Sequence, residues 1–328
     1  MKSLIAGLAL VASVVAESRT SAPPGCVTVS SSGGDFTSIQ QAVDSFDTGS
    51  SGEQCIFLSP GTYNEQVLIS SRSAQFTIYG YTDDTSSYAG NKATITGRKS
   101  QADGLSNDQT ATLRVKAKNF KLYNVNVANT YGEGSQAVAL SAAADSGYYG
   151  SAFTGFQDTV LANSGKQLYA NCLIQGATDF IFGKEAPAWF EACDIRVVAK
   201  PLGYITANGR GSAGGTSYYV FNNAKVGAAS GHNVPDGAYY LGRPWGAYAR
   251  VVFQNSQLSA VVNPQGWRIW NVGDERTEGV TFAEYNNSGK GAQGTRASFS
   301  KSLSAAVSIS DVLGGDYSSA GYYDASYM

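Results

Sequence analysis

Short apolar runs broken by glycine, asparagine and serine make up most of the chain. Runs such as CIFLS, FTIYGY, ATITG and TLRVKA combine β-branched and aromatic residues, which is typical of strands between turns. Apolar spacing that fits a helix is confined to residues 37–46 and 303–313. The pattern therefore predicts an all-β protein with very few helices.

The segment 37–46 is the clearer of the two helices. Ile39, Val43 and Phe46 fall on one helical face. Thr37 and Gln40 have the spacing of a capping box at a helix start. We expect this helix at the N-terminal end of the fold.

An internal repeat organises the middle of the chain. Each unit opens with an aromatic residue or leucine, followed two positions later by a small residue or asparagine and five positions later by an apolar residue. The opening residues are Leu122, Tyr148, Tyr169, Phe190, Phe221 and Phe253, which lie 26, 21, 21, 31 and 32 residues apart. The second positions are Asn124, Gly150, Asn171, Ala192, Asn223 and Asn255. The fifth positions are Val127, Phe153, Ile174, Ile195, Val226 and Leu258.

This repeat favours a solenoid. A core period of 21 residues suits one turn of a right-handed parallel β-helix, with the longer units carrying loop insertions. One unit is too small to bury its own apolar face, so neighbouring units must stack. The rival architecture is an antiparallel β-sandwich, whose hairpins need no fixed register between distant strands. The helix at 37–46 would cap the open N-terminal end of the solenoid and cover its edge.

The N-terminus has the pattern of a secretory signal. Lys2 precedes an apolar run, Leu4–Val15, that is too short to span a bilayer. We expect a signal peptide over residues 1–16, a single mature domain over 17–328 and a secreted, extracellular protein. Four cysteines fit an oxidising compartment. Asn286 begins the one Asn-x-Ser/Thr sequon and is a predicted glycosylation site.

Charge and hydropathy argue against two classes of partner. The chain has 23 basic and 25 acidic residues, which leaves no basic footprint for nucleic acid. Beyond the N-terminal run, no stretch is apolar enough to cross a membrane. We expect neither partner, and we expect a monomer.

Two aspartates occupy equivalent places in adjacent units. Asp158 and Asp179 are 21 residues apart, and each lies ten residues after the opening tyrosine of its unit. Stacked strands lie about 4.8 Å apart, so the two carboxyl groups should be neighbours on one face. Two ionised carboxylates at this distance repel by roughly 3 kcal/mol at an effective dielectric constant of about 20. One should therefore stay protonated while the other is charged.

Two glutamines extend this constellation. Gln136 precedes Gln157 by 21 residues, so QAVAL, QDTVL and TDFIF align on successive coils. An ionised aspartate can attack a carbonyl while its protonated neighbour acts as an acid and the amides stabilise the oxyanion. The alternative is a structural ladder of polar residues on the solenoid surface. The glutamine pair and the nearby rings of Phe156, Phe180 and Phe182 argue against this alternative.

Other hydrolytic machinery is missing from the sequence. The one histidine, His232, lies in a loop-like stretch, and no Gly-x-Ser-x-Gly elbow accompanies it. The sequence has no HExxH motif, no cluster of cysteine and histidine, and no calcium-loop spacing of carboxylates. We therefore expect no metal and no cofactor.

A second group of candidate residues lies in YYLGRPWGAYARVVF. Arg243 offers a planar charged fork for a carboxylate, and Trp245 offers a flat apolar plate on which a sugar ring can stack. The alternative is a surface ion pair beside a core tryptophan.

The cysteines suggest two cross-links. Cys172 and Cys193 share the 21-residue offset, and the rung spacing falls within the Cα separation that a disulfide needs. Cys26 and Cys55 each begin a short β-run near the N-terminal cap and are the expected second pair. The alternative is four free, buried thiols.

Together these residues resemble the pectin methylesterases, carbohydrate esterases that de-esterify pectin. The resemblance runs from Val27 to about Ala292. Its motifs occur in the family order: GDFTSIQQAV, GTYNE, QAVAL, GFQDTV, DFIFG, LGRPW, GW and EYNNSG. The signal-led form looks like the secreted enzymes of filamentous fungi.

The resemblance implies hydrolysis of galacturonate methyl esters in pectin to methanol and polygalacturonate. By this analogy Asp179 is the nucleophile that forms an acyl-enzyme, and Asp158 protonates the leaving methoxide and then activates water. Gln136 and Gln157 would form the oxyanion site, and Arg243 would keep Asp179 ionised. The residues expected to bind substrate are Gln136, Phe182, Arg243, Trp245 and Trp267.

Two other function classes remain open. A polygalacturonase or a pectin lyase can use the same kind of solenoid, because fold alone does not decide function. A non-catalytic, wall-binding solenoid is the third hypothesis. Methanol release without shortening of the polymer distinguishes an esterase from both.

Overall fold

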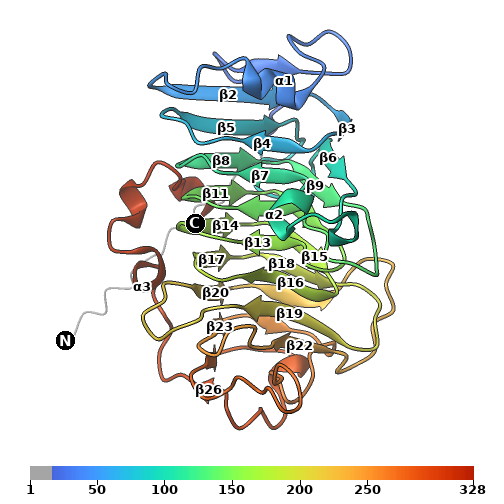
Figure 1. Cartoon of the computed structure of the whole chain (residues 1–328), viewed down its shortest axis with the longest axis vertical. Coiled ribbons are helices and arrows are strands. Elements are labelled where there is room, and N and C mark those ends of the chain that lie inside the picture. Colours follow the sequence, from blue (N-terminus) through green and yellow to red (C-terminus); the bar gives the residue numbers. More distant parts are fainter. Residues whose placement is uncertain (1–16) are drawn as a thin grey trace, which may run out of the picture.

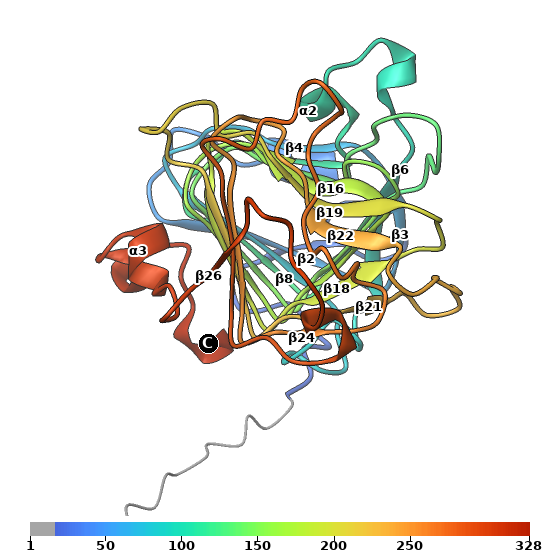
Figure 2. The ribbon, with the colours of Figure 1, turned by 90° about the horizontal axis from the view of Figure 1, so that it is seen from below.

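The computed structural model describes residues 17–328, whose strands form three parallel sheets wound around one long axis (Figure 1). Viewed along this axis, the strands of successive coils lie over one another around a filled interior (Figure 2). The fold is a right-handed parallel β-helix, so the solenoid prediction is confirmed and the β-sandwich alternative is wrong. The signal peptide predicted over residues 1–16 lies outside the described residues.

Successive coils contribute strands to each sheet. The eleven-stranded sheet contains β1 (Val27–Val29), β2 (Glu53–Leu58), β5 (Gln75–Gly80), β8 (Phe120–Tyr123), β11 (Ser146–Tyr149), β14 (Gln167–Ala170), β17 (Pro187–Glu191), β20 (Tyr218–Asn222), β23 (Arg250–Gln254), β25 (Thr281–Tyr285) and β26 (Lys301–Ser302). The eight-stranded sheet contains β3 (Gly61–Asn64), β6 (Ala93–Gly97), β9 (Asn126–Asn129), β12 (Ala152–Thr154), β15 (Leu173–Gly176), β18 (Asp194–Val197), β21 (Lys225–Ala228) and β24 (Gln257–Leu258). The seven-stranded sheet contains β4 (Val67–Ile69), β7 (Leu113–Val115), β10 (Leu140–Ala142), β13 (Val160–Ala162), β16 (Thr178–Gly183), β19 (Gly203–Asn208) and β22 (Tyr239–Gly242).

The repeat positions coincide in space. The six opening residues pair directly from coil to coil in the eleven-stranded sheet. The fifth-position residues pair in the same way in the eight-stranded sheet. The rings of Phe190, Phe221 and Phe253 form a buried stack with centroid separations of 4.3 Å at both steps. Each such contact stabilises the stack by about 0.5–1.5 kcal/mol beyond the burial of area.

The second position of the repeat is where each coil turns between two sheets. All six residues there have a positive φ, between 48° at Ala192 and 55° at Asn124. Asparagine and glycine tolerate this left-handed conformation best, which explains their prevalence. Asn286 continues the column with a φ of 48°, and its amide donates to Asn255 Oδ1 at 3.0 Å. Asn286 is exposed, and its glycosylation stays a prediction.

Helix α1 (Ile39–Asp44) covers the N-terminal end of the solenoid (Figure 1). It begins after Ser38, whose hydroxyl accepts a hydrogen bond from the Gln41 backbone N–H, so the N-cap lies one residue after the predicted Thr37 and the predicted capping box is wrong. Glu65, between β3 and β4, explains the displacement. Its carboxylate accepts a hydrogen bond from Ser38 Oγ at 2.7 Å and one from the Ile39 amide at 2.9 Å.

The C-terminal segment lies along the outer face of the eleven-stranded sheet (Figures 1 and 2). Helix α3 (Ile309–Leu313) covers the last part of the predicted 303–313 helix, because Leu303 directly follows β26 and its backbone N–H donates to the carbonyl of Glu284 in β25. The other short helices are α2 (Asn107–Thr110), η1 (Gln101–Asp103), η2 (Lys290–Ala292), η3 (Tyr317–Ser319) and η4 (Ala325–Tyr327). None of the helices within residues 17–328 has the length and apolar character that crossing a bilayer requires.

One predicted disulfide is present and the other is not. Cys26 and Cys55 are bonded, with a Cα separation of 4.7 Å. Cys172 and Cys193 are free and buried, so that predicted cross-link is wrong.

The thiols of Cys172 and Cys193 explain why no bond forms between them. Cys172 donates to the carbonyls of Tyr148 and Ala170, and Cys193 donates to the equivalent carbonyls one coil later. The two thiols therefore point the same way. A disulfide needs the Cβ atoms about 3.5–4.5 Å apart and the sulfurs turned toward each other. Ser151, at the equivalent position one coil earlier, donates in the same manner to the carbonyl of Tyr149 in its own coil.

Candidate active site

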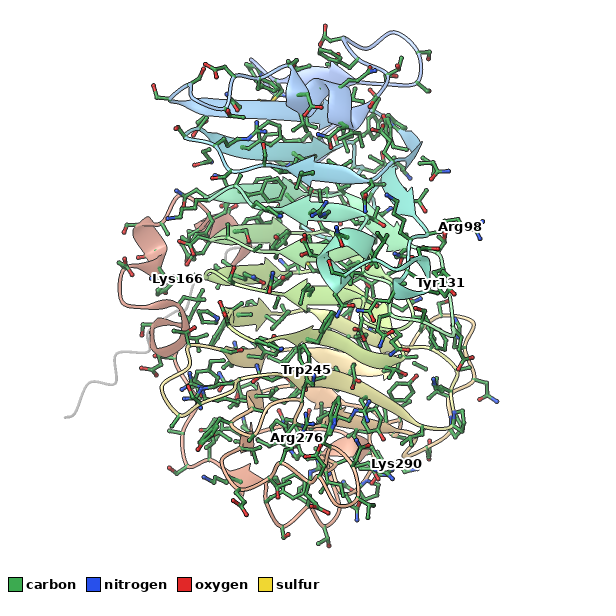
Figure 3. All side chains as sticks on the ribbon, viewed as in Figure 1. Arg98, Tyr131, Lys166, Trp245, Arg276 and Lys290 are labelled. Carbon is green, nitrogen blue, oxygen red and sulfur yellow. A yellow bond between two sulfur atoms is a disulfide. The ribbon has the colours of Figure 1, made fainter. Side chains whose placement is uncertain are left out.

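The outer face of the seven-stranded sheet carries a cavity of about 290 Å³. Figure 3 shows Trp245 on this face, beside the strands of the same sheet. Six residues predicted from the sequence line the cavity together: Gln136, Gln157, Asp158, Asp179, Phe182 and Trp245. Residues from four coils thus meet at one place.

An unusual backbone conformation places the two aspartates. Asp158 has a φ of 65° and Asp179 a φ of 49°, both in the left-handed region. Aspartate tolerates this conformation better than most residues. The Asp158 amide donates to the carbonyl of Thr178 at 3.1 Å, which keeps the two coils in register at this turn. The equivalent turn on adjacent coils therefore brings both carboxyl groups to the cavity, as the 21-residue offset predicts.

The preceding coil departs from the predicted register by one residue. The Ala137 amide donates to the Gln157 carbonyl at 3.1 Å, which keeps Gln136 and Gln157 on neighbouring rungs. Leu140, however, pairs with Val160 and not with Leu161. The amides of two successive residues, Ala139 and Leu140, both donate to the Thr159 carbonyl, which is the hydrogen-bond pattern of a β-bulge.

Arg243 forms a planar, two-point ion pair with Asp179. Its Nε lies 2.9 Å from Oδ1 and its Nη2 lies 2.7 Å from Oδ2. Both side chains are largely buried, with exposed fractions of 17% and 10%. Charge-assisted hydrogen bonds in this arrangement are about twice as strong as neutral ones. The geometry fixes the orientation of the Asp179 carboxylate.

The two carboxyl groups differ in their electrostatic environment. Burial raises the pKa of Asp158 well above its usual range, and the neighbouring charge of Asp179 raises it further. Burial also raises the pKa of Asp179, but the hydrogen bonds and charge of Arg243 oppose this effect. These directions favour the shared proton on Asp158 and the negative charge on Asp179.

The two glutamines lie beside the pair with their amide groups free. Within residues 17–328, neither side chain forms a hydrogen bond to another protein group, although both line the cavity. Two N–H donors are therefore available to an oxygen atom bound next to Asp158 and Asp179.

The aromatic residues of the site differ from the prediction at one position. Trp245 is half-buried, and its ring centroid lies 6.1 Å from that of Phe182. Trp267 is 1% exposed and stacks on Phe282 at 4.4 Å in the core, so its assignment to the cleft is wrong. Side chains alternate along the extended segment that pairs with Gly242, and this alternation turns Trp267 inward. Trp270, three residues later, lines the cavity instead.

Two further polar residues of the cavity were not predicted. Gln101 and Asn107 belong to the segment between β6 and β7, and Gln101 Nε2 donates to Asn107 Oδ1 at 2.8 Å. The backbone N–H of Gln101 also donates to the backbone carbonyl of Gln136 at 2.9 Å, which attaches this segment to the cleft. The segment lies outside the repeat, so periodicity gave no signal. Within residues 17–328 no three histidine, cysteine or acidic side chains gather as a metal site would require.

Comparison with known proteins agrees with this geometry. The pectinesterase family model matches residues 26–311. A pectinesterase of Aspergillus aculeatus is 51% identical over 332 residues, which cover 100% of both chains. A pectinesterase of Aspergillus niger is 47% identical over 331 residues, which cover 100% of this chain and 99% of the relative.

Solved structures extend the likeness to the fold. The pectin methylesterase of Aspergillus niger in deglycosylated form superposes with a TM-score of 0.88 at 43% identity, covering 95% of this chain and 100% of that one. The pectin methylesterase of carrot gives a TM-score of 0.81 at 27% identity, covering 93% and 98%. The chain belongs to the pectinesterase family.

Proposed function

We propose that the protein hydrolyses the methyl esters of galacturonate in pectin with Asp179 as the nucleophile and Asp158 as general acid and then base. Membership of the pectinesterase family makes the chain a carboxylic ester hydrolase. The division of labour rests on one observation, the two-point ion pair of Arg243 with Asp179 beside an Asp158 without such a partner. The polygalacturonase and lyase alternatives have no comparable support.

In the first step, an ionised oxygen of Asp179 attacks the ester carbonyl carbon. The amides of Gln136 and Gln157 donate hydrogen bonds to the oxyanion that forms. When the tetrahedral intermediate collapses, the bond to the methoxy oxygen breaks and Asp158 gives its proton to that oxygen. Methanol leaves, and a galacturonyl anhydride remains on Asp179.

In the second step, Asp158 is a carboxylate and takes a proton from water. The hydroxide attacks the galacturonyl carbonyl, and Asp179 leaves as a carboxylate. The product acid loses its proton to solvent. Asp158 is protonated and Asp179 ionised again, so the pair returns to its resting state.

The rings of Trp245 and Phe182 contact the sugar that carries the ester. Aromatic faces suit the apolar faces of pyranose rings, and Trp245 is accessible from the cavity. Action as a secreted monomer is part of the same proposal, and the Cys26–Cys55 disulfide supports an oxidising compartment.

Methanol release from methyl-esterified pectin tests this assignment. Asp179→Asn should lose activity completely, because an amide cannot form the anhydride. Asp83→Asn is the matched control, since Asp83 is 58% exposed in a surface ion pair. Circular dichroism should show that both variants fold. A folded Asp179→Asn protein with near-normal methanol release would refute the nucleophile assignment.

A further inference from the structure

Arg243 reaches Asp179 across an intervening coil. Asp179 lies on β16, Arg243 follows β22, and β19 lies between these two strands. Two rungs separate the ends of the ion pair by about 9.6 Å of sheet. A long side chain spanning this gap has many rotamers, of which few give two parallel hydrogen bonds to one carboxylate.

Two aromatic rings hold the guanidinium at the end of this span. The guanidinium carbon of Arg243 lies 4.1 Å from the ring centroid of Tyr204 and 4.3 Å from that of Trp270. Tyr204 is on β19, directly in the coil that Arg243 crosses, and Trp270 comes from the segment after β24. We call Tyr204 and Trp270 the aromatic clamp.

We propose that the aromatic clamp positions Arg243 and thereby keeps Asp179 ionised and correctly oriented for attack. This inference rests on the proposed function, because it takes Asp179 as the nucleophile. Cation–π contacts are strongest at desolvated sites such as this one, and the flat ring faces restrict the plane of the guanidinium. Tyr204 acts through Arg243 and is a positioning residue, whereas Trp270 contacts Arg243 and also lines the cavity.

Tyr204 contributes its ring face. Its side chain is 8% exposed, it does not line the cavity, and its hydroxyl has no hydrogen-bond partner within residues 17–328. Burial raises its pKa, so the phenol stays neutral. The ring also packs near Tyr240 of the next coil, with centroids 6.0 Å apart and planes 25° apart. These contacts hold the Tyr204 ring in place.

Arg276, six residues later in the same segment, holds the ring of Trp270 in place. The guanidinium carbon of Arg276 lies 4.9 Å from the Trp270 ring. Arg276 also donates to the Trp245 carbonyl and forms an ion pair with Asp274. Arg276 therefore connects Trp270 to the backbone of the cleft, and Figure 3 shows Arg276 and Trp245 on the same face.

The aromatic clamp affects the pH dependence of activity through the pKa of Asp179. The charged groups that act on Asp179 are Arg243 and Lys200, which lower its pKa, and Asp158, its neighbour on the preceding coil. The charge of Asp158 also acts on Arg243, and the charges of Arg268 and Arg243 oppose the rise in the pKa of Tyr204. When the clamp is lost, Arg243 spends less time on Asp179, and the pKa of Asp179 rises. The enzyme then needs a higher pH to ionise its nucleophile.

Paired substitutions separate the clamp from bulk packing. Tyr204→Leu removes the ring, whereas Tyr204→Phe keeps the ring face and loses the hydroxyl. We expect the acid limb of the kcat profile to move up by about one pH unit in Tyr204→Leu and to stay in place in Tyr204→Phe. KM should change little, because Tyr204 does not line the cavity. Trp270→Leu and Trp270→Phe repeat the acid-limb comparison at the second ring; KM is not compared for this pair, because Trp270 lines the cavity.

Tyr218→Leu is the matched control. The ring of Tyr218 contacts the Arg250 guanidinium at 4.1 Å in the eleven-stranded sheet, so this change removes a similar contact away from the cavity. Its acid limb should not move. An unmoved acid limb in folded Tyr204→Leu and Trp270→Leu would overturn the proposal.

Two further measurements make every outcome decisive. In an Arg243→Lys background the planar fork is absent, so Tyr204→Leu should add no further shift; an added shift would mean that Tyr204 acts by another route. If Tyr204→Leu fails to fold, the Trp270 pair decides. Active, folded Asp179→Asn protein would instead refute the proposed function, whatever the clamp variants do.

Discussion

The pH profile of Asp158→Asn is the sharpest test of the shared proton. In the wild-type enzyme, attack needs ionised Asp179, so activity rises with pH through the pKa of that group. Departure of methanol needs protonated Asp158, so activity falls as the pH rises through the pKa of Asp158. Burial raises both values, and that of Asp158 is raised further by the charge of Asp179. The profile should therefore be a bell.

The separation of the two limbs follows from the coil spacing. Two charges one rung apart, at about 4.8 Å, repel by roughly 3 kcal/mol at an effective dielectric constant of about 20. This corresponds to roughly two pH units between the limbs. Asparagine at position 158 mimics the protonated acid. The variant should therefore keep the acid limb where it is, lose the alkaline limb, and turn over about 10²–10⁴-fold more slowly.

Methanol release is measured across the pH range with a blank for spontaneous ester hydrolysis. Circular dichroism at each pH shows that the variant remains folded. If the alkaline limb persists in Asp158→Asn, or if the acid limb disappears, the proton does not reside on Asp158 and the reasoning from burial and charge fails.

Two further predictions concern the core. Denatured, unreduced protein should contain two titratable thiols, those of Cys172 and Cys193, and a count of zero or four would contradict the cysteine arrangement. Phe190→Ala removes a buried ring that stacks between Tyr169 and Phe221, and it should lower the free energy of unfolding by about 3–5 kcal/mol in denaturant titration; a change below about 1 kcal/mol would show that this stacking contributes little.

Periodicity predicted those features of the fold that repeat. Stacked strands impose one register on many coils, so an aromatic residue and a left-handed asparagine recur at fixed offsets. The same offset located Asp158 and Asp179, because both occupy equivalent turns with positive φ. Where a bulge breaks the register, as at Leu140, the pairing predicted from the 21-residue offset is displaced by one residue.

Side-chain direction was harder to predict than position. Cys172 and Cys193 stack as predicted, yet their thiols point along the same direction and bind carbonyls. Trp267 and Trp270 are three residues apart in one segment, and only the local pairing with Gly242 decides which faces the core. Rotamers and the phase of alternation depend on neighbours outside the repeat, which a periodic pattern does not contain.

The residues that tune the site come from segments with no common spacing. In a regular solenoid, two aspartates at equivalent positions of adjacent coils lie close together, because coil stacking sets their separation. It does not by itself choose which one ionises. That choice needs a cation on one side, and Arg243 supplies it from two coils away.

A cation delivered over such a span must be held at its far end. The rings of Tyr204, on the crossed coil, and Trp270, on a later segment, provide this support. The regular stacking of coils therefore brings the two carboxyl groups close together. The irregular segments give them different environments, and this difference decides which one is the nucleophile and which one the acid. Substitutions in the ladder should change stability first, whereas substitutions in the clamp should change the pH profile first.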